Sequence, residues 1–191
     1  KVTVMADRAH LINPDVSVVA RQLAFSLETA PGIFDSHFDF VIDAIDSFYA
    51  KVALLETCVE RKCPVVSSMG AAWKLNPADV KVADLFQTRS CPLARQLRKH
   101  LRKRGINAGV TTVYSEENPL LPPTLGAERE AMPEGRAHGS ISYMPAVFGQ
   151  TAASVVIRTL LEDLPLRRRG EAPRKRSRPD GAGSAYAGRR V

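Results

Sequence analysis

The stretch FDFVIDAIDSFYAKVALLETCVERKCPVVSSMG, residues 38–70, contains the pattern that decides the fold. Residues 38–45 form an apolar run that is typical of a strand buried on both faces. A helix is expected over about 47–62, and PVVSS at 64–68 predicts a second buried strand. Strand, helix and strand in this order form a βαβ unit, which implies a parallel sheet. We therefore expect an α/β fold.

Further elements are expected on both sides of this unit. The first helix is predicted to end at the Asn-Pro pair at 13–14, because proline does not continue a helix. The others are a strand at 15–20, a solvent-facing strand at 78–88, a helix at 93–105, a strand at 109–115, a long loop at 117–139 and an apolar helix within 142–164.

Positive charge is concentrated at the end of the chain. The formal net charge is +7, and residues 166–191 alone carry nine Lys and Arg against two acidic residues. Residues 1–165 are neutral overall, so the basic character belongs to the final segment. That segment is rich in Gly, Pro and Arg and poor in large apolar residues, which favours a disordered tail. We expect a folded domain over 1–165 and a basic tail over 166–191. The tail either binds RNA or an anionic surface, serves as a basic localisation signal, or is solvated without a specific partner.

The cysteine pattern and the hydropathy exclude several classes of protein. Cys58, Cys63 and Cys91 form an odd set without a CxxC pair, which argues against a disulfide framework and against a zinc ribbon. Cys91 precedes a predicted helix, where a thiolate would be favoured, but a packing role is the preferred interpretation for all three. No apolar run reaches the length needed to cross a membrane.

Two carboxylates lie at the end of the first buried strand. Ligands of open parallel sheets bind beyond the carboxyl ends of the strands, and Asp46 follows the 38–45 strand directly. From its position, Asp46 either caps the next helix or binds Mg²⁺ on a nucleotide phosphate. Asp43 lies nearer the strand interior, where a structural hydrogen-bonding role is expected.

The predicted helix at 93–105 carries a dense basic face. Two interpretations are open for it, a contact with a nucleic-acid backbone or an ordinary solvated helix surface. The candidate contacts are Arg95, Arg98, Lys99, Arg102 and Lys103.

Several motifs resemble one enzyme family over roughly residues 1–164. The stretch FDFVIDAIDSFYAKVALLETC, with a D-x-x-D pair at Asp43 and Asp46, resembles the segment after the nucleotide-binding half of the ThiF/MoeB/E1-like adenylating superfamily. The opening KVTVMADRAHLINPDV resembles the preceding helix of that superfamily. One branch, the tRNA threonylcarbamoyladenosine dehydratases (the TcdA/YgdL group), is similar at SSMGAAWKLNPADVKVADL, TRSCPLARQLRKHLRKRGI, TTVYSEENP and HGSISYMPAVFGQTAASVVI.

This resemblance implies a fold, a reaction and a set of site residues. The fold would be a Rossmann-like ThiF/E1-type sheet with flanking helices. The reaction would be an ATP- and Mg²⁺-dependent cyclisation of the threonylcarbamoyl group on the adenosine next to the tRNA anticodon, with net loss of water. Asp46 would hold Mg²⁺ at the catalytic site, and Lys1 would approach the ATP phosphates. The basic residues at 95–103 would contact tRNA, and we expect a homodimer in the cytoplasm or an organelle.

The chain also departs from the family pattern. No G-x-G-x-x-G loop occurs in the 191 residues, so the N-terminal βαβ portion that cradles the phosphates is expected to be missing. By itself the chain is therefore expected to be inactive. It is interpreted as part of a longer enzyme, since its first residues read as the middle of a helix. The alternatives are a truncated RNA- or partner-binding module, or an activator of a ubiquitin-like or sulfur-carrier protein, although the CxxC pairs of such activators do not occur.

Overall fold

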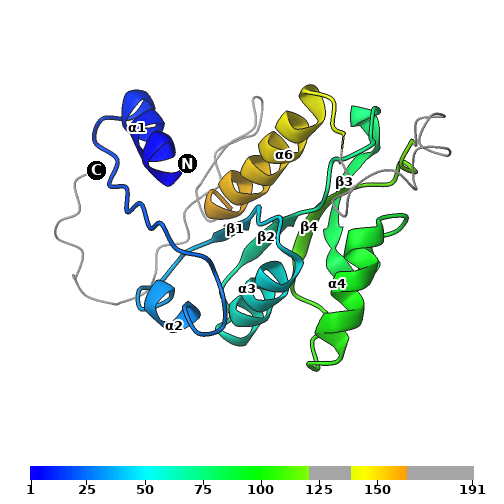
Figure 1. Ribbon diagram of the computed structural model, residues 1–191, viewed down its shortest axis with the longest axis horizontal. Coiled ribbons are helices and arrows are strands. Elements are labelled where there is room, and N and C mark those ends of the chain that lie inside the picture. Colours follow the sequence, from blue (N-terminus) through cyan, green and yellow to red (C-terminus); the bar gives the residue numbers. More distant parts are fainter. Residues whose placement is uncertain (121–138, 163–191) are drawn as a thin grey trace, which may run out of the picture.

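A computed structural model describes residues 1–120 and 139–162 of the chain (Figure 1). The described residues form an α/β fold, with one four-stranded sheet between helices. The elements, in chain order, are α1 Val2–Ile12, α2 Ala30–Ile33, β1 Val41–Asp43, α3 Phe48–Glu60, β2 Val65–Ser68, η1 Pro77–Asp79, β3 Val80–Asp84, η2 Leu85–Gln87, α4 Pro92–Arg102, β4 Thr111–Ser115 and α6 Tyr143–Leu160.

The sheet has the strand order β1-β2-β4-β3. β1 and β2 are parallel, with Asp43 opposite Ser67, and β2 and β4 are parallel, with Ser67 opposite Thr112. β3 is antiparallel to β4 and forms one edge of the sheet. The predicted βαβ unit is therefore confirmed, and the carboxyl ends of β1, β2 and β4 share one edge of the sheet.

Helices cover both faces of this sheet (Figure 1). α6 crosses one face, while α3 and α4 lie on the other. The core on the α3 side contains Leu55 and Cys58, and the core on the α6 side contains Met144 and Phe148. Because both faces are covered, a central strand residue such as Val66 is fully buried.

The predicted elements are mostly present, and the largest differences concern three of the expected strands. The strand expected at 38–45 is paired only over Val41–Asp43, because the chain turns where Asp43 Oδ1 accepts a hydrogen bond from Ile45 N. The strand expected at 78–88 is paired over Val80–Asp84, and a 3-10 turn follows at Leu85–Gln87, where Asp84 caps Phe86 N. The strand expected at 15–20 is wrong, because no described strand lies beside it to share backbone hydrogen bonds.

The N-terminal helix agrees with its predicted range but contributes nothing to the core. α1 has no buried residue, and its apolar side chains, such as Leu11, are exposed. The short helix α2 was not predicted. The predicted loop at 117–139 lies largely outside the described residues, and so does the predicted tail at 166–191.

Candidate active site at the carboxyl edge of the sheet

A buried ion pair holds the end of β1 against α3 and β2. Lys51 Nζ donates a hydrogen bond of 2.7 Å to Asp43 Oδ2, and Ser67 Oγ donates one of 2.6 Å to the same oxygen. Lys51 Nζ also donates to the carbonyl of Ser68 at 3.1 Å. The side chains of Lys51 and Asp43 are 1% and 0% exposed, so this pair is withdrawn from water. The structural role expected for Asp43 is confirmed.

Asp46 lies at the end of the turn that Asp43 stabilises. The second oxygen of Asp43, Oδ1, accepts a hydrogen bond of 3.0 Å from Ile45 N, one residue before Asp46. Asp46 itself is exposed, and no hydrogen bond or ion pair joins its carboxylate to another described residue. The helix-capping interpretation of Asp46 is wrong, because Ser47 occupies the N-cap position of α3 and no side chain caps this helix. The Asp46 carboxylate is thus left accessible to a ligand.

The segment after β2 is tied to the segment after β4. Lys74 is buried, and its Nζ donates a hydrogen bond to the carbonyl oxygen of Glu117. The carboxylate of Glu117 accepts from Leu75 N at 2.9 Å and from Asn76 N at 2.9 Å. Burial lowers the pKa of Lys74 below its ordinary value. These contacts give the carboxyl edge beyond β2 and β4 a fixed backbone.

Trp73 closes this segment against the residues that precede α6. Trp73 N donates to the carbonyl of Gly139 at 2.9 Å, and Tyr143 Oη donates to the carbonyl of Leu75 at 2.7 Å. A Cβ at position 139 would approach the Trp73 ring within 3.2 Å, so the absence of a side chain at Gly139 allows the ring to lie close to this backbone.

The candidate RNA contacts on α4 are not equivalent. Arg95, Lys99, Arg102 and Lys103 are exposed. Arg98 is half-buried, and its Nη1 donates to the Leu85 carbonyl at 3.3 Å, the Thr88 carbonyl at 3.1 Å and the Thr88 hydroxyl. Burial lowers the pKa of the Arg98 guanidinium, the neighbouring arginines adding to the shift. Arg98 therefore holds the η2 turn. Arg102 is exposed, but its guanidinium lies over the Phe86 ring of the same turn, 5.4 Å from the ring centroid, whereas Arg95, Lys99 and Lys103 face solvent.

Lys1 and Asp46 are not brought together among the described residues. Lys1 is exposed at the N-cap of α1, and no ion pair or hydrogen bond of the described residues joins it to Asp46. Its assignment to the ATP phosphates stays a prediction.

The cysteines are packing residues. Cys58 and Cys91 are buried members of the core, and Cys63 is half-buried against it. Burial raises the pKa of the Cys58 thiol to about 12, which leaves it uncharged and a poor nucleophile. Within residues 1–120 and 139–162, no three His, Cys, Asp or Glu side chains gather to hold a metal ion.

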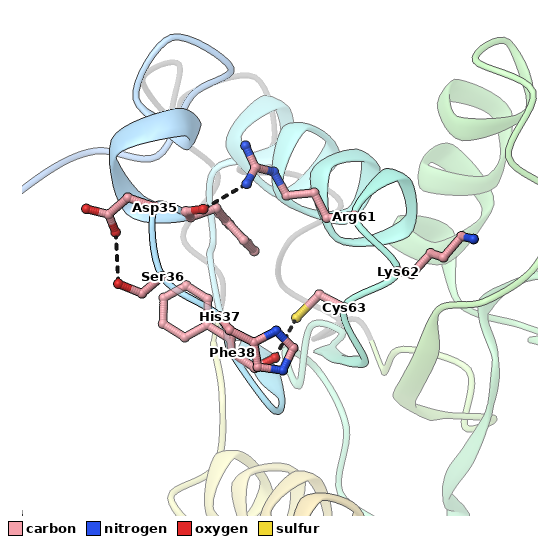
Figure 2. Close-up of a pocket in the computed structure, with 8 residues that line it drawn as sticks. Asp35, Ser36, His37, Phe38, Arg61, Lys62 and Cys63 are labelled. Carbon is pink, nitrogen blue, oxygen red and sulfur yellow. Dashed lines mark hydrogen bonds between the residues drawn. The ribbon is translucent and has the colours of Figure 1, made fainter.

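A hollow of about 350 Å³ lies at the opposite, amino edge of the sheet. Figure 2 shows it between the segment before β1 and the end of α3, where Arg61 donates to the Phe34 carbonyl at 2.7 Å. Cys63 and His37 also line it, and Lys62 points away from the other side chains. Because its walls precede β1 and β2, whereas Asp46 follows β1, the hollow is not part of the candidate site.

The described residues have a Rossmann-like α/β fold with an accessible carboxylate at the carboxyl edge of the sheet, and the chain belongs to the ThiF family, whose model matches residues 1–176. Its relatives include tRNA threonylcarbamoyladenosine dehydratases. That of Bacillus subtilis is 33% identical over 174 residues, covering 88% of this chain and 68% of the relative. That of Escherichia coli is 30% identical over 177 residues, covering 84% of this chain and 66% of the relative.

Solved structures agree with this assignment. The Escherichia coli dehydratase TcdA in complex with ATP has a TM-score of 0.74 and 28% identity, and the match covers 84% of this chain and 63% of that chain. The complex with AMP has the same TM-score, with 29% identity and 85% and 64% coverage. The present chain thus spans about two thirds of the length of these relatives. Among the helices of the described residues, none is both long enough and apolar enough to cross a membrane.

Sequence reasoning missed the two buried lysines. Lys51 lies on the same helical face as the buried Leu55 and Cys58, and eight residues after an aspartate in a buried strand. A lysine on an apolar helix face is the signal that could have predicted this ion pair. The contacts of Lys74 depend on residue 117, far away in the sequence, so no local pattern indicates them.

Proposed function

We propose that the protein is an ATP-dependent tRNA threonylcarbamoyladenosine dehydratase, with Asp46 as the residue that holds the metal at its active site. The single observation that carries this proposal is the exposed Asp46 carboxylate at the carboxyl edge of the sheet, in a chain whose relatives are named for this activity. A relative of this chain was solved in complex with ATP, and ligands of open parallel sheets bind beyond the carboxyl ends of the strands, so a nucleotide is expected at this edge.

The donor set at Asp46 fits Mg²⁺. This ion is usually held by one or two carboxylates together with phosphate oxygens and waters, so a single accessible aspartate is an adequate protein ligand. When bound, Mg²⁺ would offset the negative charge of the phosphates. Asp46 is available for this role because Asp43, and not Asp46, forms the buried ion pair with Lys51.

The reaction is an activation of a carboxylate followed by ring closure. The carboxylate of the threonylcarbamoyl group attacks the α-phosphorus of ATP and displaces pyrophosphate. An atom of the same modification then attacks the activated carbonyl, and AMP leaves with the former carboxylate oxygen, so the substrate loses one water in total. Because the nucleophile belongs to the substrate, its effective concentration is high and no cysteine nucleophile is needed. The buried, uncharged Cys58 is compatible with this chemistry.

The tRNA is held in part by the basic face of α4. Arg95, Lys99, Arg102 and Lys103 are exposed, and cations in such positions neutralise backbone phosphates and release counterions. Arg98 is not counted in this face, because its guanidinium bonds to Thr88 and Leu85.

The proposal includes a homodimer that acts in the cytoplasm or in an organelle. Sedimentation of the purified 191-residue chain tests the first part, since a dimer has twice the chain mass of 20.9 kDa. A mass equal to one chain at micromolar concentration contradicts the dimer.

The activity is tested with the protein as its own cell makes it. The protein is incubated with ATP, Mg²⁺ and tRNA that carries threonylcarbamoyladenosine, and the nucleosides are analysed by mass spectrometry. We expect a loss of one water that requires ATP, and we expect Asp46→Ala to abolish it. Asp39→Ala is the matched control, because Asp39 is an exposed aspartate on the other side of β1.

Each outcome of this assay has a defined meaning. Turnover by Asp46→Ala equal to wild type contradicts the role of Asp46. Absence of water loss with the wild-type protein contradicts the proposed dehydratase activity. If the tRNA is bound without turnover, the second candidate function applies, an RNA-binding module that depends on the exposed cations of α4.

A further inference from the structure

Three aromatic rings form a cluster at the start of α3. The ring centroids of Phe48 and His100 lie 5.0 Å apart, those of Phe48 and Tyr49 5.4 Å, and those of Tyr49 and His100 6.3 Å. All three pairs are edge-to-face, so in each pair the edge of one ring meets the face of the other. This cluster, here called the aromatic cluster, joins α3 to α4.

Packing of the fold accounts for only part of this cluster. Phe48 and His100 are half-buried, as expected for side chains that lie between two helices. Tyr49, in contrast, is 75% exposed, and no hydrogen bond of the described residues uses its hydroxyl. A ring in this position adds little to the core and is accessible to a ligand.

The aromatic cluster lies beside the candidate active site. Asp46 precedes Phe48 by two residues and Tyr49 by three, and all of them belong to the turn and first residues of α3 that follow β1. The Asp43 turn and the buried Lys51 fix this part of the backbone. A ligand group that contacts Tyr49 therefore lies close to a ligand group that contacts Asp46.

Positive charge flanks the same cluster. Lys99 directly precedes His100 in α4, and Lys103 is the C-cap residue of this helix, three residues after His100; both lysines are exposed. Neither forms an ion pair with a described residue. Exposed aromatic rings next to free cations are the combination with which proteins bind single-stranded nucleic acid, since the rings stack on bases and the cations attract phosphates.

We propose that the aromatic cluster is a stacking platform for one unpaired base of the RNA, with Tyr49 as the contacting ring and Lys99 and Lys103 as the phosphate contacts. The inference rests on the proposed function, because it takes the RNA to be the tRNA substrate and the base to lie in the loop that contains the modified adenosine. An unpaired loop base suits such a platform, whereas a base inside a duplex has both faces already stacked.

Binding measurements on Tyr49 variants test the platform without using catalysis. The probe is an RNA hairpin with an unmodified single-stranded loop, compared with a copy whose loop nucleotides are abasic. We expect wild type to prefer the intact loop about tenfold, and Tyr49→Ala to bind both hairpins with the same, weaker affinity. Tyr49→Phe and Tyr49→Trp should keep the preference, because stacking needs a ring and not a hydroxyl. Lys99→Glu should weaken the binding of both hairpins and reduce the salt dependence of their affinity. Lys62→Glu, just after the other end of α3, should change neither quantity.

The outcomes separate this inference from the proposed function. If Tyr49→Ala still prefers the intact loop to the abasic loop as strongly as wild type, the platform is overturned. It is also overturned if Tyr49→Phe loses this preference to the same extent as Tyr49→Ala. A change of sedimentation mass in Tyr49→Ala also overturns it, because the ring would then belong to a protein interface. Tyr49→Ala removes only the edge-to-face contacts of an exposed ring, so its thermal midpoint should fall by no more than a few degrees. None of these readouts uses ATP or turnover, so the platform can fail while the dehydratase assay succeeds, or the reverse.

Discussion

Asp43 and Asp46 are three residues apart, but their environments differ, since Asp43 is buried and hydrogen-bonded and Asp46 is exposed. Asp43 accepts hydrogen bonds from Lys51, Ser67 and the backbone at Ile45, which fills its acceptor positions from inside the protein. Asp46 accepts no bond from the described residues and faces solvent. A carboxylate whose oxygens have no partner in the protein can bind a metal ion or a hydrogen-bond donor of a substrate. A carboxylate that accepts several hydrogen bonds within the protein stabilises the fold instead.

The buried pair leads to a stability prediction. Replacing Lys51 by Met leaves the Asp43 carboxylate buried without its cation, and we expect the free energy of unfolding to fall by about 3–5 kcal/mol. Urea titration of the purified chain measures this change. The double variant Asp43→Asn, Lys51→Met should recover most of the loss, because no charge is then buried alone.

The matched control for this prediction is Lys62→Met, which removes an exposed lysine just after α3. It should change the free energy of unfolding by less than about 0.5 kcal/mol. A Lys51→Met variant as stable as this control would mean that the ion pair does not hold the end of β1.

At the scale of single elements, α4 separates its arginines by function. Arg98 bonds to the turn at Leu85–Gln87 and to Thr88, while Arg95, one turn earlier, is exposed. We expect Arg98→Ala to lower the free energy of unfolding by about 1–3 kcal/mol, because the Thr88 and Leu85 acceptors lose a charged donor. Arg95→Ala should leave stability within about 0.5 kcal/mol of wild type and weaken RNA binding instead.

Thermal or urea unfolding and an RNA titration, run on the same two variants, check this division. Equal losses of stability in Arg98→Ala and Arg95→Ala would contradict it. So would a loss of RNA affinity confined to Arg98→Ala.

The extent of the elements could be predicted where the sequence pattern and the tertiary contacts agree. The apolar run before Asp43 and the helix after it predicted the βαβ unit, because a strand that is buried on both faces consists of a continuous run of apolar residues. The expected strand at 15–20 has a similar local pattern but no partner strand among the described residues, and pairing is a property of the neighbours. The short α2 is a single turn whose residues carry no periodicity.

The site could be predicted only in part, for a similar reason. Asp46 was selected as a candidate because its position after a buried strand is visible in the sequence, and the structure shows that its side chain is exposed. The alternative interpretation, in which Asp46 caps the next helix, was wrong because Ser47 is the N-cap residue. Helix propensity does not distinguish between N-cap positions that differ by one residue. The roles of Arg98 and Lys74 depend on the partners Thr88 and Glu117, which only the folded chain brings near.

At the scale of the whole molecule, the sheet separates two edges. The carboxyl edge carries Asp46 and the tied segments at Lys74 and Glu117, while the amino edge carries the hollow near Arg61 and Cys63 (Figure 2). Antiparallel β3 begins at the carboxyl edge, so its start also lies near this site. The body between the edges is held by the core around Cys58.

This core makes the stability of the molecule sensitive to alkali. Burial raises the pKa of Cys58 from 9.0 to about 12, so the folded state keeps the thiol protonated when the unfolded chain has ionised it. The stabilising effect is complete below pH 9 and is lost as the pH rises from 9 towards 12, at no more than about 1.4 kcal/mol per pH unit.

Urea midpoints measured between pH 8 and pH 10.5 check this, with Cys58→Ala as the comparison. The variant is expected to be less stable at pH 8, because it leaves a cavity, but to lose less stability as the pH rises. Parallel pH dependences for the two proteins would mean that Cys58 does not carry the effect.

The hydrogen bond from Ile45 N to Asp43 also affects the entropy of ligand binding. Ordering one residue of a free chain costs about 1–2 kcal/mol of conformational entropy. Residues 44–46 are already fixed by Asp43, and Asp43 by Lys51, before any ligand arrives. A ligand that reaches Asp46 would therefore meet an ordered backbone turn, and only the rotamer freedom of the exposed Asp46 side chain would still be lost on binding.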